Sequence, residues 1–335
     1  MKNVLITGAS GFIGSFLVEE GIQRNYSVYA AIRKSSSRQY LTDPGIHLVE
    51  MDFSTKESVL KTLTTFLNQG IRFDYIIHNA GLTKANRKED YYNVNCRNTI
   101  NFIDAIRESG TNPEKFIFIS SLAAYGPGHP VTMKPVLLTD EPRPIEIYGK
   151  SKLEAENYIR SLTDFPWVIM RPTGVYGPRE KDYYVFFKTI NRGLETYIGR
   201  ETQILTFIYV RDLVRVVFDA LESSHVRKSY FVADGKEYTT KEFAAITKNY
   251  LKKKTVRITV PKGTVKVLAS ILESLYSLWN AMPTLNSDKY SVLSAKNWRC
   301  ETDPLQQDLQ FRARYDLEKG VAETIAWYRE HGWLK

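Results

Sequence analysis

Short apolar runs alternate with helical stretches through the first half of the chain, and this alternation limits the folds open to it. Strands are predicted over residues 4–7, 27–32, 47–51, 73–79, 115–120 and 167–171, and helices from about residue 12 and over 89–108 and 148–162. Strands that are apolar throughout are typical of a sheet covered on both faces, and helices between them are typical of parallel strands. The sequence therefore predicts an α/β fold of the Rossmann type, with a doubly wound parallel sheet.

Beyond about residue 172 the alternation weakens, and aromatic and basic residues become frequent. We predict a first domain over residues 1–172 and a smaller mixed α/β part over 173–335, in which about 205–235 returns to the first domain. A helix is predicted over 262–282, because apolar residues recur at three- and four-residue spacing: Val265, Leu268, Ile271, Leu272, Leu275, Trp279 and Met282. Three interpretations stay open for this helix: packing on the body of the protein, a lid over a hydrophobic pocket, or contact with a membrane surface.

The composition excludes several classes of protein. The chain has 335 residues, 43% hydrophobic and 25% charged, which is typical of a globular protein. It contains no run of about 18 apolar residues, so we expect no membrane span, and no signal-peptide pattern follows Met1. Cys96 and Cys300 lie far apart without Cys-x-x-Cys neighbours, so we expect reduced thiols and a cytoplasmic location.

The net charge is +9, which fits either nucleic acid or anionic small molecules as partners. Lysine and arginine are scattered, with the densest run at Lys252–Lys254, and no recognition module interleaves aromatic with basic residues. We therefore expect a small-molecule substrate and no nucleic acid. The five histidines show no ligand spacing, so no metal is expected.

A glycine-rich stretch, LITGASGFIG at residues 5–14, joins the first predicted strand to the first helix. Gly8, Gly11 and Gly14 would let the backbone approach a pyrophosphate, and the helix N-terminus would supply free N–H groups and positive potential. In this position within an alternating α/β chain, the pattern predicts a dinucleotide site.

The end of the second strand indicates which dinucleotide is bound. Sites that prefer NAD carry an acidic residue about 20 residues after the glycines, for the ribose 2′-hydroxyl. Here the sequence reads AAIRKSSSR, with Arg33 and Lys34 and no carboxylate. A guanidinium would pair with a 2′-phosphate, so NADP(H) is favoured over NAD(H), although Arg33 also fits a solvated loop charge. Asp52, at the end of the third strand, fits either the adenine amino group or a helix cap, and Ser54 and Thr55 can also cap that helix.

Residues 148–152 read YGKSK at the start of a predicted helix. Tyr148 and Lys152 are one turn apart, so they face the same side of that helix. Taken alone, the pattern fits an ordinary exposed turn as well as a proton-transfer pair, because such spacing is common in helices.

Taken together, several ordered motifs resemble the extended short-chain dehydrogenase/reductases, the NAD(P)-dependent epimerase/dehydratase superfamily. The motifs are TGASGFIG at 7–14, Asp52, HNAG at 78–81, ISSLAAYG at 119–126, YGKSK at 148–152, RPTGVYGP at 171–178 and FIYVRDL at 207–213. They span most of the chain. Within the superfamily, the basic end of the second strand and the C-terminal ETIAWYREHGWL are similar to the dihydroflavonol-4-reductase and 3β-hydroxysteroid dehydrogenase-like branch.

The resemblance implies hydride transfer, with Tyr148 as the catalytic acid/base. Lys152, with the oxidised nicotinamide, would lower the tyrosine pKa from about 10 and would hold the nicotinamide ribose. Ser121 would donate a hydrogen bond to the substrate oxygen, and Asn95 would help to position the active-site region. The resemblance also implies a homodimer, formed through the helix after the fourth strand and the helix that carries Tyr148.

By the same resemblance, the cofactor would contact the glycine-rich loop, the ends of the strands and the segment after the sixth strand. The residues expected there are Gly8, Ser10, Gly11, Phe12, Ile13, Gly14, Arg33, Lys34, Asp52, Phe53, Asn79, Ala80, Gly81, Ser120, Pro172, Thr173 and Val175.

Two departures from the family pattern narrow the chemistry. Leu122 and Ala123 stand where sugar-nucleotide 4,6-dehydratases carry an acid pair, which disfavours dehydration. Leu205 stands where nucleotide-sugar epimerases carry an arginine for the diphosphate. Three arginines could substitute for that anchor: Arg200, Arg211 and Arg312. Four aromatic residues either suit an apolar substrate or pack in the core: Tyr183, Tyr184, Phe186 and Phe187.

Three functions stay open. The first is an NADP(H)-dependent oxidoreductase for a secondary alcohol or ketone, such as a sterol- or flavonol-like ring compound. The second is an NAD-dependent nucleotide-sugar 4-epimerase. The third is a sensor or scaffold that has lost the chemistry, which the presence of Ser121, Tyr148 and Lys152 disfavours.

Overall fold

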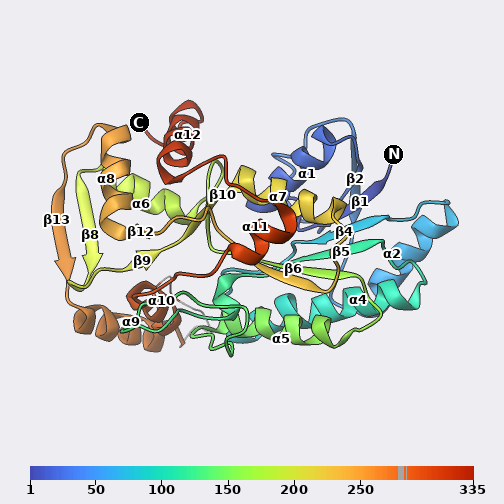
Figure 1. Ribbon diagram of the computed structural model, residues 1–335, viewed down its shortest axis with the longest axis horizontal. Coiled ribbons are helices and arrows are strands. Elements are labelled where there is room, and N and C mark those ends of the chain that lie inside the picture. Colours follow the sequence, from blue (N-terminus) through green and yellow to red (C-terminus); the bar gives the residue numbers. More distant parts are fainter. Residues whose placement is uncertain (278–282, 284) are drawn as a thin grey trace. The chain divides into compact units, whose positions relative to one another are not determined.

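The computed structural model describes residues 1–277, 283 and 285–335 (Figure 1). The chain forms two compact units. The first comprises Met1–Ala124, Ile147–Arg171 and Val214–Tyr230, and the second comprises Tyr125–Glu146, Pro172–Leu213 and Phe231–Lys335. The domain boundary expected at residue 172 stays a prediction.

The first unit is built on a seven-stranded sheet in the order β11-β6-β5-β4-β1-β2-β3 (Figure 1). The strands are β1 (Asn3–Thr7), β2 (Ser27–Ile32), β3 (Ile46–Glu50), β4 (Tyr75–His78), β5 (Lys115–Ile119), β6 (Trp167–Pro172) and β11 (Lys228–Val232). Strands β1 to β6 pair in parallel, which confirms the predicted doubly wound Rossmann sheet. The chain order reverses between β1 and β4, and sheets of this kind bind ligands at the carboxyl ends of the strands beside such a reversal.

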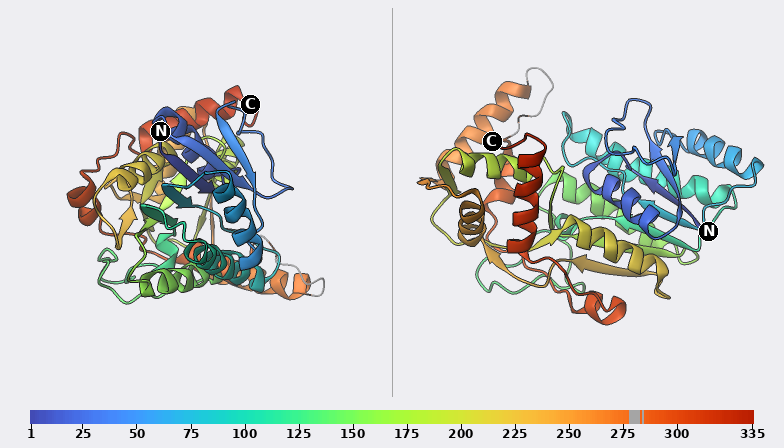
Figure 2. Two further views of the ribbon diagram at one scale, coloured as in Figure 1. Left: turned by 90° about the vertical axis from the view of Figure 1, so that its right-hand side faces the viewer. Right: turned by 90° about the horizontal axis from the view of Figure 1, so that it is seen from above.

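Helices cover both faces of this sheet (Figures 1 and 2). They are α1 (Phe12–Gln23) and α7 (Val210–Glu222) on one face, and α2 (Lys56–Asn68), α4 (Asn98–Glu108) and α5 (Ile147–Ser161) on the other. Under the second set, apolar side chains such as Phe102 and Ile159 form a buried core. On the opposite face Gly21 lets α1 approach closely, since a Cβ there would lie 2.9 Å from Val28 Cγ2 and 3.1 Å from Phe218 Cζ. Cover on both faces explains why β4, β5 and β6 are buried throughout and mainly apolar, whereas the edge strand β3 is largely exposed.

The helix predicted over 89–108 is interrupted in the structure. A π-helical turn, Asn93–Arg97, joins α3 (Lys88–Tyr92) to α4. Turns of this kind are frequent at functional sites. Here the turn directs Asn95 into the protein, where it is fully buried and bonded to other segments. Apolar periodicity could not predict the interruption, because these long-range hydrogen bonds stabilise it.

The second unit combines helices with short paired strands: β7 with β10, β9 with β12 and β8 with β13. Its elements are β7 (Gly174–Tyr176), α6 (Asp182–Asn191), β8 (Leu194–Ile198), β9 (Ile204–Leu205), β10 (Phe207–Tyr209), β12 (Tyr238–Thr239), α8 (Thr240–Leu251), β13 (Val256–Val260), α9 (Lys262–Ser277), α10 (Ser287–Ser294), α11 (Asp303–Leu309) and α12 (Leu317–Glu330). The mixed α/β character predicted for the C-terminal part is therefore confirmed.

Aromatic side chains form the core of the second unit. Of the four aromatic residues of α6 that were candidates for a substrate pocket, Phe187 belongs to this core, and Tyr183, Tyr184 and Phe186 are partly buried and pack against it. Phe186 stacks on Phe243 with ring centroids 4.5 Å apart, and the Tyr184 hydroxyl donates to the Trp333 carbonyl oxygen at 2.6 Å. Of the two interpretations of these aromatics, the structure favours core packing.

The helix predicted over 262–282 begins at Lys262 and is described as far as Ser277, so Trp279 and Met282 lie outside the described residues. Val265 and Ala269 are buried, whereas several other apolar residues of α9 are exposed. Within the described ranges, no helix is long and apolar enough to cross a membrane.

Candidate active site

The loop between β1 and α1 requires glycine at two positions for different reasons. Gly8 has a φ of +64°, and a Cβ on it would lie 2.8 Å from the Ala80 Cα. A Cβ on Gly14 would lie 2.0 Å from the Gly8 carbonyl oxygen. Gly11 is the exposed N-cap of α1 and provides no capping side chain. The two glycines let the loop pack closely against Ala80 and against itself, and no side chain caps the backbone N–H groups at the start of α1, an arrangement that fits a pyrophosphate cradle.

The ends of β1, β2 and β4 lie next to one another, because Thr7 pairs with Ala31 on one side and with His78 on the other. Arg33 and Lys34 directly follow β2, and both are exposed. Neither has a carboxylate partner in the part of the chain that the structure describes. Both cations are therefore available to an anionic ligand.

Asp52 and the buried Phe53 follow β3. One Asp52 carboxylate oxygen accepts from the Ser54 N–H at 2.9 Å. The N-cap of α2 is Thr55, whose hydroxyl accepts from the Ser58 N–H at 3.2 Å. Thr55 rather than Asp52 therefore caps the helix, and the contact of Asp52 with adenine stays a prediction.

A buried chain of hydrogen bonds leads from the end of β1 into the sheet. The Thr7 hydroxyl accepts from the two backbone N–H groups that follow β4, at 3.1 and 3.0 Å, and lies 2.8 Å from His78 Nδ1. His78 Nε2 lies 3.0 Å from the Thr99 hydroxyl, which donates to the Asn95 carbonyl oxygen at 2.9 Å. Because the Thr7 oxygen already accepts twice, its proton goes to Nδ1, and this assigns the Nε2–H tautomer to His78.

Acid should destabilise the protein through His78. Burial lowers the pKa of His78 to about 3, so between its ordinary pKa and about 3 the unfolded chain binds a proton that the folded chain does not. The resulting stability is fully present above about pH 6.5 and is lost as the pH falls, by about 2 kcal/mol between pH 6.5 and pH 5. We expect urea unfolding of wild type and His78→Gln to show a smaller pH dependence in the variant. His129→Gln, at an exposed histidine, is the control, and equal pH dependence in His78→Gln and wild type would refute the assignment.

Asn95 connects this chain of hydrogen bonds to α5. Its Oδ1 accepts from the Leu82 N–H at 2.7 Å, and its Nδ2 donates to the Leu82 carbonyl oxygen and to Ser151 Oγ, both at 3.0 Å. Ser151 Oγ in turn donates to the Tyr148 carbonyl oxygen at 2.8 Å. The loop after β4 is therefore tied to the first turn of α5, an arrangement that no local pattern in the sequence could predict.

Lys152 lies between the ends of β4 and β5. It is 3% exposed, its Nζ donates to the Ile119 carbonyl oxygen at 2.9 Å, and it lies 4.7 Å from the centre of the Phe118 ring. Gly81 makes room for it, since a Cβ there would lie 3.1 Å from Nζ. Burial lowers the pKa of Lys152 to about 8, and the Glu156 carboxylate partly offsets this effect. Lys152 therefore stays mainly protonated below that pH.

Tyr148 and Ser121 belong to segments that pack together. Tyr148 is the second residue of α5 and is half-buried. Ser121 is half-buried and precedes a 3₁₀ turn, Leu122–Ala124, which packs against α5. The Ser121 hydroxyl oxygen accepts from the Ala123 N–H at 3.1 Å. The structure thus places the serine turn against the helix that carries the tyrosine and the lysine, and their catalytic roles stay a prediction.

A buried ion pair joins α5 to the sheet. Arg171, at the end of β6, donates from Nε to Glu156 Oε1 at 2.9 Å and from Nη2 to Oε2 at 2.7 Å. Neither side chain is exposed. The Ser120 hydroxyl also donates to Glu156, although Ser120 was expected to line the cofactor. Sequence analysis missed this pair, and its signals were an arginine inside the apolar run WVIMRP and an acid one turn after Lys152.

Three further cofactor candidates follow Arg171 in the second unit. Pro172 ends β6. The Thr173 N–H and hydroxyl both donate to the Val232 carbonyl oxygen, at 3.1 and 3.2 Å, and Val175 pairs with Ile208. Their contact with the nicotinamide stays a prediction.

The two departures from the family pattern have structural counterparts. Leu122 and Ala123 are buried, and Leu205 packs on the aromatic core of the second unit. Arg211, one of the arginines that could replace the diphosphate anchor, pairs with Glu323 at 3.0 Å. Across the residues placed by the structure, no group of three His, Cys, Asp or Glu side chains could hold a metal ion.

The Rossmann sheet, the glycine cradle and the buried lysine define a nicotinamide-dinucleotide enzyme. Over residues 4–233 the chain matches the NAD dependent epimerase/dehydratase family, and it belongs to that family. The resemblance inferred from the ordered motifs is therefore confirmed, as is the expectation of an NAD(P)-dependent enzyme.

Curated relatives have names that describe different reactions. The chain is 25% identical to ceramide reductase of Caulobacter vibrioides, over 99% of this chain and 96% of the relative. It is 28% identical to UDP-glucose 4-epimerase of Vibrio cholerae, over 89% of this chain and 90% of the relative. It is 23% identical to a decarboxylating sterol-4-alpha-carboxylate 3-dehydrogenase of Dictyostelium discoideum, over 96% of this chain and 100% of the relative. The fold is shared with dTDP-glucose 4,6-dehydratase of Bacillus anthracis, solved in complex with NAD, at a TM-score of 0.78 and 17% identity over 100% and 99% of the two chains.

Proposed function

We propose that this protein is an oxidoreductase that transfers hydride between NADP(H) and a secondary alcohol or ketone. Residues 1–172 would bind the cofactor and residues 173–335 the substrate. The observation that carries the proposal is the buried Lys152 at the carboxyl edge of the sheet, one turn after Tyr148 and on the helix against which the Ser121 turn packs.

The residues of the chain would transfer the proton, and the bound nicotinamide would supply or accept the hydride. Tyr148 gives its phenolic proton to the alkoxide that forms in reduction and takes it back in oxidation. The Lys152 ammonium favours the phenolate through its charge. Ser121 Oγ accepts from the Ala123 N–H, and its own proton would be donated to the substrate oxygen. Asn95 and Ser151 hold the first turn of α5 in place.

The preference for NADP(H) is proposed from Arg33 and Lys34, which are exposed beyond β2 and lack carboxylate partners in the described ranges. We expect Arg33→Ala to weaken NADPH binding about 10- to 100-fold, because charge-assisted hydrogen bonds to the 2′-phosphate would be lost. NADH has no such phosphate, so its affinity should not change. Fluorescence titration of wild type and variant with both cofactors measures the two effects.

Arg38→Ala is the matched control for that titration. Arg38 lies in the same loop but is paired with Glu50 at 3.1 Å, so its removal should leave the NADPH affinity unchanged. If wild type binds NADH more tightly than NADPH, or if both variants behave alike, Arg33 is a solvated loop charge and the NADP assignment is wrong.

An apolar, sterol- or flavonol-like substrate completes the proposal. It is supported by Leu205 in place of a diphosphate-binding arginine and by relatives named as acting on ceramide and sterol. The aromatic residues of α6 do not support it, because they pack in the core. Turnover of sterol-like and aromatic ketones with NADPH tests this part.

A nucleotide-sugar 4-epimerase is the second candidate. It is favoured by the 28% identity to UDP-glucose 4-epimerase, the highest among the three relatives described above. An epimerase would retain NAD through purification and would interconvert UDP-glucose and its 4-epimer without net consumption of cofactor. Observation of that activity would exclude the oxidoreductase proposal.

The proposal includes a homodimer and a cytoplasmic location. The dimer would form through α4 and α5, whose inner faces pack on the sheet. Sedimentation velocity of the purified protein tests the dimer, and a monomer at micromolar concentration would exclude it.

A further inference from the structure

Helix α9 has an apolar face that the described protein leaves open. Val265 and Ala269 are 7% and 1% exposed and form the packed side of the helix. The adjoining side carries Val267, Leu268, Ile271 and Leu275, of which 59, 48, 51 and 48% is exposed. Because these positions recur at three- and four-residue spacing, they form one continuous stripe along the helix. Exposed apolar patches of this kind mark sites of interaction.

The acidic residue of α9 has partners of its own, and the exposed Lys266 adds a positive charge to the helix. Glu273 is the acidic residue of the helix, and its carboxylate accepts from the Ser287 hydroxyl at 2.6 Å and from the Ser287 N–H at 3.2 Å. Lys262, at the start of the helix, pairs with Glu201 at 2.5 Å. The open stripe therefore carries no carboxylate that would repel an anionic surface.

The strand that precedes α9 also carries exposed apolar side chains. Val256 and Ile258 of β13 are 66 and 42% exposed, and Val256 pairs with Leu194 of β8, which is 39% exposed. These side chains lie on one face of the β8–β13 pair, because alternate residues of a strand point to the same face. Figure 1 shows β13 running towards the start of α9.

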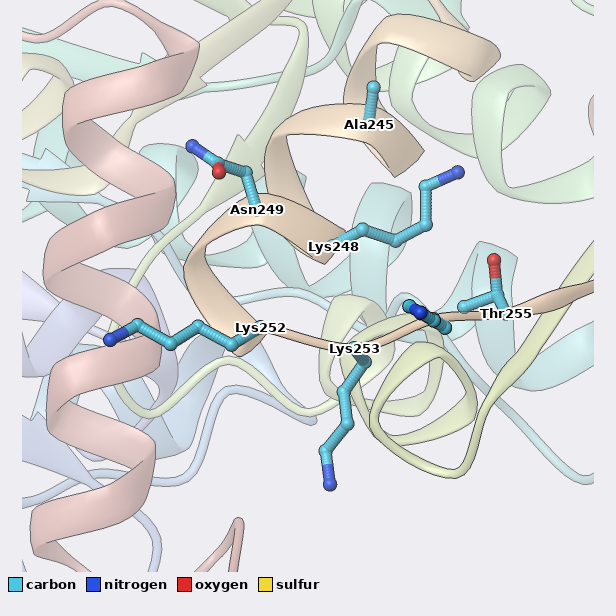
Figure 3. A pocket seen from close by; sticks show the side chains of 7 residues that line it. Ala245, Lys248, Asn249, Lys252, Lys253 and Thr255 are labelled. Atoms are coloured by element: carbon cyan, nitrogen blue, oxygen red, sulfur yellow. The ribbon is translucent and has the colours of Figure 1, made fainter.

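Lysines concentrate where β13 begins. Lys252, Lys253 and Lys254 are among the residues that line an open hollow of about 630 Å³ at the end of α8, together with Lys248 (Figure 3). Lys248 is neutralised by Glu195 at 2.6 Å. No ion pair holds the ammonium groups of the other three within the ranges that the structure covers. Figure 3 shows the side chains of Lys252 and Lys253 extending in different directions from the backbone.

We propose that the α9 stripe and the Lys252–Lys254 cluster dock this protein onto the surface of an anionic lipid bilayer. The lysines and the stripe lie at the two ends of β13, and the exposed Val256 and Ile258 of that strand lie between them in the chain. An anionic bilayer binds both kinds of group, because apolar side chains enter the headgroup boundary and lysines are attracted by the lipid charge. A second copy of this chain fits less well, because each copy carries a net charge of +9 and the same lysine cluster. The proposal does not depend on the enzymatic activity.

Co-sedimentation with vesicles tests the docking. The full-length protein is mixed with vesicles of phosphatidylglycerol and phosphatidylcholine, or of phosphatidylcholine alone, at low and high salt. We expect binding to the anionic vesicles, weaker binding at high salt and little binding to phosphatidylcholine alone. Replacing Lys252, Lys253 and Lys254 together with glutamine should weaken binding on the order of 100-fold, since each lysine near a membrane contributes about a 5-fold effect.

The apolar stripe needs its own variant, because any protein with this charge adsorbs weakly to anionic vesicles. Leu268→Asn with Ile271→Asn should also abolish most of the binding, although it leaves the net charge unchanged. Val185→Asn, at a 62% exposed valine of α6, is the matched control and should bind like wild type. Circular dichroism checks that each variant is folded.

Three results would overturn the proposal. One is the absence of wild-type binding to anionic vesicles. Another is undiminished binding of the Leu268→Asn, Ile271→Asn variant, which would mean adsorption by net charge alone. The third is a wild-type dimer that does not bind vesicles and that this variant converts into monomers, which would mean that a second copy covers the stripe.

Discussion

Replacement of Tyr148 by phenylalanine is expected to lower kcat about 10²- to 10⁴-fold, which is the usual contribution of a positioned acid/base group. The phenyl ring keeps the packing of the half-buried side chain, and the bond from Ser151 Oγ to the Tyr148 carbonyl oxygen does not involve the hydroxyl. The variant should therefore fold and bind NADPH like wild type. Steady-state kinetics with an apolar ketone that wild type reduces, together with NADPH titration, separates loss of chemistry from loss of binding.

Tyr158→Phe is the matched control on the same helix. The Tyr158 hydroxyl donates to Asp104, so this variant also loses a hydrogen-bonded phenol from α5. It should keep the wild-type kcat, because Tyr158 lies more than two turns beyond Tyr148. Full turnover in Tyr148→Phe would show that another group supplies the proton.

Removal of one partner of the Glu156–Arg171 pair should cause the largest loss of stability. Both side chains are fully buried, and Glu156→Gln leaves the Arg171 guanidinium in the interior without its counter-charge. We expect the free energy of unfolding of the first unit to fall by about 3–5 kcal/mol. Urea unfolding followed by fluorescence, with hydrogen exchange of α5 and β6 to assign the effect to this unit, measures the change.

A double replacement distinguishes the ion pair from packing. Glu156→Leu combined with Arg171→Met removes both charges, so it should destabilise much less than the sum of the two single replacements. Asp164→Ala breaks the solvent-exposed pair with Arg107 and serves as the control, for which we expect little change. Additive effects of Glu156→Leu and Arg171→Met would mean that the two charges do not stabilise each other.

Much of the fold could be predicted from patterns that act within a few residues. The strand at 27–32 was predicted with its observed bounds, and the helices beginning near residues 12 and 148 start within one residue of the predicted positions. Apolar runs and helical periodicity depend directly on which side chains are buried. A sheet covered on both faces can therefore be predicted from them. The second unit was less predictable, because its strands are short and its pairings join segments far apart in the chain.

Some features of the candidate site could be predicted from the sequence and others could not. The glycine-rich loop, Arg33 and the Tyr148–Lys152 pair could be found from local spacing and from the order of the motifs. The hydrogen bonds from Thr7 through His78 and Thr99 to Asn95 could not be predicted from local spacing. The same is true of the Glu156–Arg171 ion pair. Each joins residues on different elements, and a lone polar residue in an apolar run does not reveal its partner.

Local sequence was thus sufficient for the Rossmann sheet, the dinucleotide loop and the helix with Tyr148 and Lys152, because covalent neighbours set the strand, turn and helix propensities on which they depend. Tertiary packing decided the rest. It buried Lys152 and so lowered its pKa, it assigned the α6 aromatics to the core, and it left one face of α9 open. These properties depend on which distant side chains exclude water from a given group, and that is settled only when the elements come together.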